Sequence, residues 1–186
     1  MRIIGGSFKG RALASVGKGD AGAHLRPTTD RIRESLFNVL QGGTFGDPIT
    51  DATVLELFAG TGALGLEALS RGAAHATFVD DGRKAQSLIA ENIRFTGTKQ
   101  DTTIIRRDAT RLPANTGPQA TLVFLDPPYG TGLGVKALGA AHENNWLAQG
   151  ALVVFEDNAP APPLPDFERL DERRYGDTYI TFLEVP

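Results

Sequence analysis

The sequence has 186 residues and contains no cysteine, one methionine and one tryptophan. The absence of cysteine excludes disulfide bonds, thiolate metal sites and a thiol nucleophile. Histidine is also scarce: His24, His75 and His142 are widely separated, and none of them has a partner at the spacing of a metal-ligating pair. We therefore expect no bound metal ion.

Long apolar runs are missing as well. No segment approaches the roughly 20 apolar residues of a membrane-spanning helix, and glycine and charge interrupt the N-terminal MRIIGGSFKGRAL too often for a signal peptide. The hydrophobic fraction of 41% and the charged fraction of 22% are those of an ordinary globular protein. These features predict a cytoplasmic, monomeric protein that forms one domain over residues 1–186 and associates with no membrane.

The formal net charge is only −3, but the charges are unevenly placed. Residues 1–40 hold seven basic and three acidic residues, whereas residues 41–186 hold 12 basic and 19 acidic residues. A basic N-terminal segment on an acidic body can contact the phosphates of a nucleic acid, and it is equally compatible with a solvated surface. Charge alone leaves both interpretations open.

The stretch TVLELFAGTGALGLEAL, residues 53–69, has the pattern of a strand, a glycine turn and a helix. A β-favouring apolar run ends at Gly60-Thr61-Gly62, and leucines at helical spacing follow. The spacing of Gly60, Gly62 and Gly65 matches the dinucleotide-binding fingerprint, in which glycines admit a ligand close to the backbone and a helix N-terminus offers free N–H groups. This stretch alone is compatible with NAD, with S-adenosylmethionine, or with a tight turn that binds nothing.

Acidic residues stand at or near the ends of three predicted strands. Glu56 lies in the first strand, Asp80 follows residues 76–79, and Asp108 follows residues 102–106. Asp80 comes 18 residues after the second glycine of the turn, close to the spacing of the acid that binds ribose hydroxyls in nucleotide-binding α/β folds. Because ligands of parallel sheets bind beyond the carboxyl ends of the strands, the three acids predict a polar rim around a nucleoside.

A fourth predicted strand, residues 120–125, runs directly into Asp126-Pro127-Pro128-Tyr129. The prolines fix the backbone and lack N–H donors, so that Asp126 and the Pro127 carbonyl can accept hydrogen bonds from an exocyclic amino group. Tyr129 offers a flat face on which a base can stack, worth about 1–3 kcal/mol. This is the most specific motif in the sequence, and it predicts a site for the amino group of a nucleobase.

Strands and helices alternate through the middle of the chain, which predicts a doubly wound, mostly parallel α/β sheet. Before it we expect a basic extension, residues 1–24, with a β-hairpin over residues 2–13. The catalytic core would then be residues 25–186, beginning with a helix capped by Thr28 or Thr29. The remaining expected elements are a helix over residues 135–147 and strands over residues 151–155, 167–174 and 178–185, the last two paired antiparallel.

Together these motifs resemble the S-adenosylmethionine-dependent amino-methyltransferases that carry DPPY. The segments MRIIGGSFKGRAL and LRPTTDRIRESLFNVL narrow the resemblance to the bacterial 16S rRNA guanine-N2-methyltransferases of the RsmD type, and the similarity runs nearly end to end. The departures are small: Thr61 stands where serine is frequent, Glu56 where aspartate is common, and Asp80 where glutamate is frequent. The resemblance implies the Rossmann-like fold of class I methyltransferases, with seven strands and an antiparallel strand near the C-terminus.

The resemblance also implies the reaction and its residues. A methyl group would pass from S-adenosylmethionine to the exocyclic N2 of guanine 966 in 16S rRNA, with naked rRNA or the assembled small subunit as partner. The implied catalytic residues are Asp126, Pro127, Pro128 and Tyr129. The implied cofactor-binding residues are Glu56, Phe58, Ala59, Gly60, Thr61, Gly62, Asp80 (ribose), Asp108 and Ala109 (adenine), and Thr28 (methionine end). The candidates for RNA phosphates are Arg2, Lys9, Arg11 and Arg26.

Other functions stay open at this level. DPPY recognises an amino group without naming the base, so adenine-N6 or cytosine-N4 methylation is the nearest alternative. An NAD(P)-dependent oxidoreductase would use the same glycine fingerprint but has no evident need for DPPY. A non-catalytic RNA-binding module would not need a complete cofactor rim. The absence of cysteine excludes the cysteine-dependent route to C5-methylpyrimidine.

Overall fold

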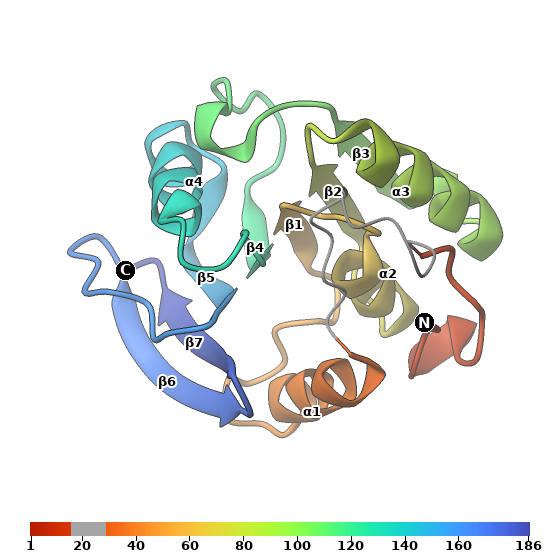
Figure 1. The fold of residues 1–186 in the computed structure, drawn as a ribbon, viewed down its shortest axis with the longest axis horizontal. Coiled ribbons are helices and arrows are strands. Elements are labelled where there is room, and N and C mark those ends of the chain that lie inside the picture. Colours follow the sequence, from red (N-terminus) through yellow and green to blue (C-terminus); the bar gives the residue numbers. More distant parts are fainter. Residues whose placement is uncertain (16–28) are drawn as a thin grey trace.

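The computed structural model describes residues 1–15 and 29–186. In this part of the chain a seven-stranded sheet is packed against helices (Figure 1). The strands are β1 (Thr53–Leu57), β2 (His75–Val79), β3 (Thr102–Ile105), β4 (Ala120–Leu125), β5 (Leu147–Asp157), β6 (Glu168–Tyr175) and β7 (Thr178–Glu184). The helices are α1 (Asp30–Gln41), α2 (Ala63–Ser70), α3 (Arg83–Thr96) and α4 (Leu133–Glu143), with short 3₁₀ helices η1 (Gly6–Phe8), η2 (Lys99–Asp101) and η3 (Ala109–Arg111).

The strand order is β3-β2-β1-β4-β5-β7-β6. Strands β1 to β5 are mutually parallel, and β7 pairs antiparallel with β5 on one side and β6 on the other. This confirms the predicted seven-stranded, mostly parallel sheet with an antiparallel strand near the C-terminus. Strands β2 and β3 lie on one side of β1, whereas β4 and β5 lie on its other side. The order in which the strands are added to the sheet therefore reverses between β1 and β4. Such a reversal is where ligands bind in open α/β sheets.

Alternate side chains along the strands face two separate apolar cores, as the two-residue period of a strand requires. Val54 and Phe124 belong to the core that includes α1, α2 and α3. Leu55 and Val123, one position along, belong to the core that includes α4. The sheet is therefore covered on both faces, and its strand ends are left for the site.

Helix α1 begins as the sequence predicts. The Thr29 hydroxyl oxygen accepts a hydrogen bond from the Ile32 amide at 3.3 Å and caps the helix, and Asp30 lies in its first turn, where negative charge is favoured. The other expected cap, Thr28, lies outside the described residues. The last residue of α1 is Gln41, and Gly42 follows it as the C-cap, with its amide donating to the Val39 carbonyl oxygen.

The N-terminal arm, residues 1–15, forms the expected hairpin only in outline. Its two limbs run antiparallel and share backbone hydrogen bonds, among them Ile3 N–H to the Arg11 carbonyl at 3.0 Å, but they form only an isolated bridge, between Arg2 and Ala12, and no regular strands. The intervening turn is the 3₁₀ helix η1, and it rests directly on α2: a Cβ atom added to Gly6 would lie 1.8 Å from the Ser70 carbonyl oxygen. Contact with α2, which the sequence pattern did not reveal, therefore shapes the arm. The proposed boundary between residues 24 and 25 lies outside the described residues.

The segment after DPPY corrects one prediction. Helix α4 spans Leu133–Glu143 and not residues 135–147. Asn145 adopts a left-handed backbone conformation with φ 63°, which ends the helix, and Leu147 already begins β5 opposite Ala120. Strand β5 therefore begins before the predicted start at residue 151, and its pairing with β4 shifts register between Ala120 and Leu122.

Candidate active site at the carboxyl edge of the sheet

The glycine turn, residues 58–62, connects β1 to α2 through left-handed backbone. Phe58, Gly60 and Gly62 have φ values of 57°, 58° and 73°. Glycine adopts this region without steric cost, whereas Phe58 is held there against its preference, as residues at functional sites often are. Gly65 has a different role, because a Cβ there would lie 2.6 Å from the ring of the β2 phenylalanine. The fingerprint glycines thus serve a tight turn and close packing of α2 on the sheet.

Glu56 lies behind the glycine turn. Its side chain is buried, and its Oε2 accepts a hydrogen bond from the Gly65 amide at 2.8 Å. Burial raises the pKa of the Glu56 carboxyl to about 8, although the amides of Gly65 and Leu64 oppose the shift. The carboxyl group therefore holds the first turn of α2 in place. Its expected role in cofactor binding stays a prediction.

Asp80 lies at the end of β2, beside the glycine turn. Its side chain is half-buried and binds two backbone amides, those of Gly60 at 2.9 Å and Gly82 at 2.8 Å. Burial raises the pKa of the Asp80 carboxyl, and the two amides and the neighbouring Asp81 act on it more weakly. The carboxylate thus sits where the ends of β1 and β2 meet, in the place expected for a ribose-binding acid.

Asp108 follows β3, the next strand outward. Its Oδ1 accepts hydrogen bonds from the Thr110 amide at 2.8 Å and the Thr110 hydroxyl at 2.7 Å, so it caps η3. The hydrogen bond from the Thr110 hydroxyl is the main reason that the pKa of the Asp108 carboxyl is lowered. Ala109 is buried directly beside it. Asp108 therefore lies beyond the end of β3, one strand outward from Asp80, and the expected contact of Asp108 and Ala109 with adenine stays a prediction.

The DPPY segment begins at the end of β4, on the other side of β1. Leu125 pairs with Leu57, and the Asp126 amide lies 3.5 Å from the Leu57 carbonyl oxygen. Asp126 is half-buried, Pro127 is buried and Pro128 is exposed. The glycine turn and the DPPY segment therefore start at neighbouring positions, at the point where the strand order reverses.

Tyr129 is held by its hydroxyl group. The hydroxyl donates a hydrogen bond to Glu156 Oε1 at 2.8 Å and lies 3.3 Å from the Thr178 hydroxyl oxygen. Burial and the nearby Glu156 carboxylate raise the pKa of the Tyr129 phenol above its ordinary value, so the hydroxyl stays protonated and can donate. These contacts fix the half-buried ring beside the end of β4.

The candidate RNA-binding residues differ in how many contacts they make within the protein. Arg2, Lys9 and Arg11 are exposed on the N-terminal arm. Arg11 also donates to the Phe95 carbonyl oxygen at 2.7 Å and lies 5.5 Å from the centre of the Phe8 ring, so part of its guanidinium serves to attach the arm. Arg26, like Thr28, lies outside the described residues.

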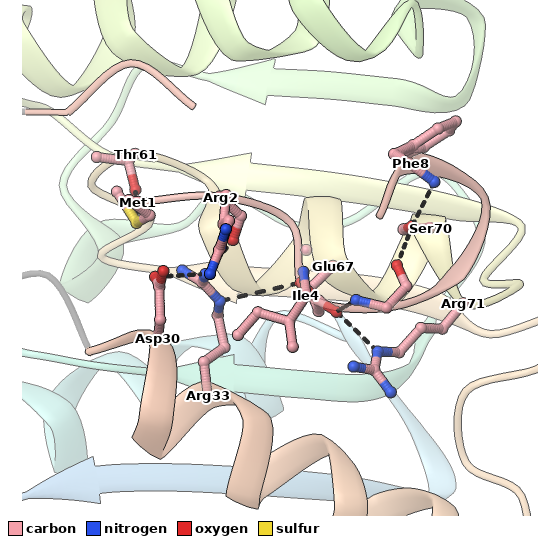
Figure 2. A network of polar contacts seen from close by, with 12 residues as sticks. Met1, Arg2, Ile4, Phe8, Asp30, Arg33, Thr61, Glu67, Ser70 and Arg71 are labelled. Carbon is pink, nitrogen blue, oxygen red and sulfur yellow. Dashed lines mark hydrogen bonds and ion pairs between the residues drawn. The ribbon is translucent and has the colours of Figure 1, made fainter. Parts of the chain in front are cut away.

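Arg33, counted among the basic residues of the N-terminal region, is completely buried and unavailable to RNA. It belongs to a network with Asp30, Glu67 and Arg71 that ties α1 and α2 to the N-terminal arm (Figure 2). No prediction from the sequence included this network. A signal for it exists, because Glu67 is an acid inside the otherwise apolar helix ALGLEALS and stands four residues before Arg71.

The described part of the chain offers neither a metal-binding cluster nor a membrane-spanning helix. No three His, Asp or Glu side chains of those residues lie where they could share a metal ion. Within residues 1–15 and 29–186, no helix combines the length and hydrophobicity needed to cross a bilayer.

Comparisons with known proteins show the family to which the chain belongs. A model of the family described as Conserved hypothetical protein 95 matches residues 1–184. Ribosomal RNA small subunit methyltransferase D of Escherichia coli is 40% identical over 156 residues, which are 84% of this chain and 74% of that protein. The protein of the same name from Haemophilus influenzae is 34% identical over 166 residues, covering 87% of this chain and 81% of its own. Among solved structures, yhhF from Escherichia coli superposes with a TM-score of 0.82 at 36% identity, covering 100% of this chain and 97% of that one.

Proposed function

We propose a reaction for this chain on the premise that it belongs to the family described as Conserved hypothetical protein 95 and is a methyltransferase of the RsmD type. The reaction is transfer of a methyl group from S-adenosylmethionine to the exocyclic N2 of a guanine in small-subunit rRNA. Guanine 966 is the proposed target. Substrate and base specificity rest on the resemblance and on the names of the relatives.

One observation supports this proposal most directly: the glycine turn and the DPPY segment begin at paired strand ends. Leu57 and Leu125 are register partners in β1 and β4, so Phe58 and Asp126 extend beyond the sheet side by side. A methyl donor bound on the glycine turn would therefore lie next to an amino group held by DPPY. A methyl transfer needs its reacting atoms about 3–3.5 Å apart and in line, and this adjacency suits that requirement.

Proposed roles follow for the DPPY residues. The guanine N2 is a weak nucleophile because its lone pair is delocalised into the ring. The Asp126 carboxylate and the Pro127 carbonyl would accept hydrogen bonds from the amino hydrogens and turn the lone pair toward the methyl group, while Tyr129 stacks on the base. The N–C bond forms as the S–C bond breaks, and the amine then loses one proton to Asp126 or to water.

The donor would be held by the residues at the ends of β1, β2 and β3. S-adenosylmethionine supplies an electrophilic methyl group on a sulfonium when it is bound. The backbone of residues 58–62 would pass under its methionine part, Asp80 would bind the ribose hydroxyls, and Asp108 with Ala109 would contact the adenine edge. Asp80 fits this role, because each of its oxygens keeps a lone pair beyond the amide that it already binds.

The N-terminal arm is the proposed RNA contact. Arg2, Lys9 and Arg11 are exposed on it, and Arg26 is the further candidate, outside the described residues. Contacts to phosphates position an RNA without reading its sequence. The target guanine would have to be unpaired or flipped out to reach Asp126 at the edge of the sheet.

Methyl transfer from tritiated S-adenosylmethionine tests the proposal. Naked rRNA and small subunits from cells that lack this protein would be offered in parallel, and the modified nucleotide mapped by mass spectrometry. We expect N2-methylguanine with wild-type protein. Replacement of Asp126 by Ala should lower turnover at least about a thousandfold, while calorimetry finds S-adenosylmethionine affinity within about threefold of wild type.

Asp166→Ala is the matched control, because Asp166 is an exposed acid outside the proposed site. It should leave turnover unchanged. Methylated adenine or cytosine would overturn the assignment of guanine but keep the class of reaction. Turnover that survives Asp126→Ala would overturn the proposed site.

A further inference from the structure

The N-terminal arm is attached at two places to helices next to the glycine turn: α2 follows the turn, and α3 contacts it through Asn92. Its first limb lies on α2, the helix that follows the turn, and its last described residues meet α3. Buried polar side chains make both attachments. The second attachment also reaches the glycine turn itself, which the first does not.

At the first attachment, the carboxylate of Glu67 accepts hydrogen bonds from the amides of Ile4 and Gly5, each at 2.8 Å. The Ser70 hydroxyl donates to the Gly5 carbonyl oxygen at 2.5 Å and accepts from the Phe8 amide at 2.9 Å. Figure 2 shows Glu67 with Ile4, and Ser70 with Phe8, together with Arg33 and Arg71 on either side of Glu67. This attachment holds the arm to the body of α2.

At the second attachment, one side chain binds both partners. Asn92 of α3 is fully buried, and its Oδ1 accepts from the Ala14 amide at 2.7 Å. Its Nδ2 donates to the Ala14 carbonyl oxygen at 3.1 Å and to the Thr61 carbonyl oxygen at 2.9 Å. Every hydrogen of the Asn92 amide group is therefore used, one on the N-terminal arm and one on the glycine turn.

The glycine turn needs such a support. Thr61 stands between Gly60 and Gly62, whose backbones are left-handed and whose conformational freedom in the absence of contacts is large. The hydroxyl of Thr61 is also 3.9 Å from the sulfur of Met1, the first residue of the arm. Asn92 of α3 and Met1 of the N-terminal arm thus both contact Thr61 and help to hold the turn in its conformation.

We propose that Asn92 is a positioning residue that fixes the glycine turn for S-adenosylmethionine and couples it to the N-terminal arm. This inference rests on the proposed function, because it takes S-adenosylmethionine as the ligand of the turn and RNA as the ligand of the arm. Asn92 itself touches neither of them. Its loss would loosen the turn and the arm together, whereas loss of Ser70 would loosen the arm alone.

Two variants of α3 test whether Asn92 fixes the glycine turn for S-adenosylmethionine. Calorimetric titration measures their affinity for S-adenosylmethionine, and thermal unfolding measures their stability. Asn92→Ala should raise the Kd for S-adenosylmethionine about tenfold or more. Thr96→Val is the matched control: Thr96 is buried one turn away and binds the carbonyls of its own helix and Thr98, not the arm or the turn. It should lower Tm but leave the Kd within twofold.

Hydrogen exchange of the unliganded variants provides a readout that needs no ligand. Asn92→Ala should speed exchange at amides of both the arm and residues 60–62, Ser70→Ala at the arm only, and Thr96→Val at neither. Binding to a small-subunit rRNA transcript should weaken in Asn92→Ala and Ser70→Ala alike.

The outcomes separate the two proposals. An unchanged Kd and unchanged exchange at residues 60–62 in Asn92→Ala would overturn the role of Asn92, as would an equal effect of Thr96→Val. Wild-type protein that binds no S-adenosylmethionine would instead overturn the proposed function, and the coupling of arm and turn would then be decided by the exchange pattern alone.

Discussion

Arg33 and Glu67 form an ion pair between two fully buried side chains, with Arg33 Nε 3.9 Å from Glu67 Oε2. Arg33 also donates to Asp30 Oδ1 at 2.9 Å and to the Arg2 carbonyl oxygen, and Glu67 also pairs with Arg71 Nε at 2.8 Å. Desolvation lowers the pKa of the Arg33 guanidinium, and the nearby carboxylates oppose that shift. Two carboxylates thus compensate the buried arginine: Asp30, which is nearer and partly exposed, and Glu67, which is fully buried.

Glu67→Gln should therefore destabilise the protein strongly. A neutral amide removes the only charge that Arg71 pairs with among these contacts and one of the two that compensate Arg33. Its NH₂ group would also face an amide of the N-terminal arm that now donates a hydrogen bond to the carboxylate. Removal of one partner from a buried pair costs about 3–5 kcal/mol, which urea unfolding would measure. Glu172→Gln provides the comparison, because Glu172 pairs with Arg169 at 3.1 Å on the surface, and such pairs contribute about 0–1 kcal/mol. Equal effects of the two substitutions would contradict a structural role for the buried pair.

Glu56 should give the stability of the protein a characteristic pH dependence. Its pKa rises from an ordinary value of 4.5 to about 8 in the folded protein. Between these values the folded state holds a proton that the unfolded state has released, so the free energy of unfolding falls as pH rises. One such group contributes a slope of up to about 1.4 kcal/mol per pH unit. Below pH 4.5 the stabilising effect is fully present, and above about pH 8 it is lost.

Glu56→Gln isolates this contribution. The glutamine side chain can still accept the hydrogen bond from the Gly65 amide, but it does not titrate, so its burial involves no desolvation of a charge. Urea unfolding at several pH values from 5 to 8 should find a flatter profile than in wild type. Asp80, whose pKa is raised in the same direction, is present in both proteins, so the difference between them reports Glu56 together with its interaction with Asp80. Glu91→Gln, an exposed substitution on α3, should keep the wild-type profile. An unchanged slope in Glu56→Gln would contradict the raised pKa.

Local patterns were sufficient to predict much of the fold. The apolar runs of β1 and β4 are visible over a few residues, and β4 has the predicted bounds, residues 120–125. The alternation of strands and helices predicted the parallel sheet, and this in turn placed Asp80, Asp108 and Asp126 at one edge. Those positions depend only on where each strand ends.

The contacts of the N-terminal arm could not be predicted in this way. In the sequence, Arg33 looks like an ordinary surface cation. Its buried partner Glu67 is 34 residues away and in another helix, so no local pattern reveals that Arg33 is buried. Asn92 likewise has no local pattern, since its partners Ala14 and Thr61 come from two distant segments. Contacts of this kind arise only from packing of the whole chain.

Asp80 is the residue for which we predict the largest effect on cofactor affinity. Asp80→Ala removes the proposed ribose acceptor and the hydrogen bond that holds the Gly60 amide, so S-adenosylmethionine should bind roughly ten- to a hundredfold more weakly. The exposed neighbour Asp81 offers a control of equal charge, and Asp81→Ala should change the Kd by less than about twofold. Similar losses from both substitutions would mean that general charge, and not the position of Asp80, governs affinity.

The ring and the hydroxyl of Tyr129 should make separable contributions to methyl transfer. Tyr129→Phe keeps the ring but loses the hydrogen bond to Glu156, so we expect kcat/KM for rRNA to fall about two- to tenfold. Tyr129→Ala also removes the proposed stacking surface, worth about 1–3 kcal/mol, and should cost a further factor of roughly five to 150. Affinity for S-adenosylmethionine, measured by calorimetry, should stay close to wild type in both variants, because the proposed donor site lies on the glycine turn. If Tyr129→Ala methylates rRNA as fast as Tyr129→Phe, the ring does not hold the base, and the hydroxyl contact serves only to order the DPPY segment.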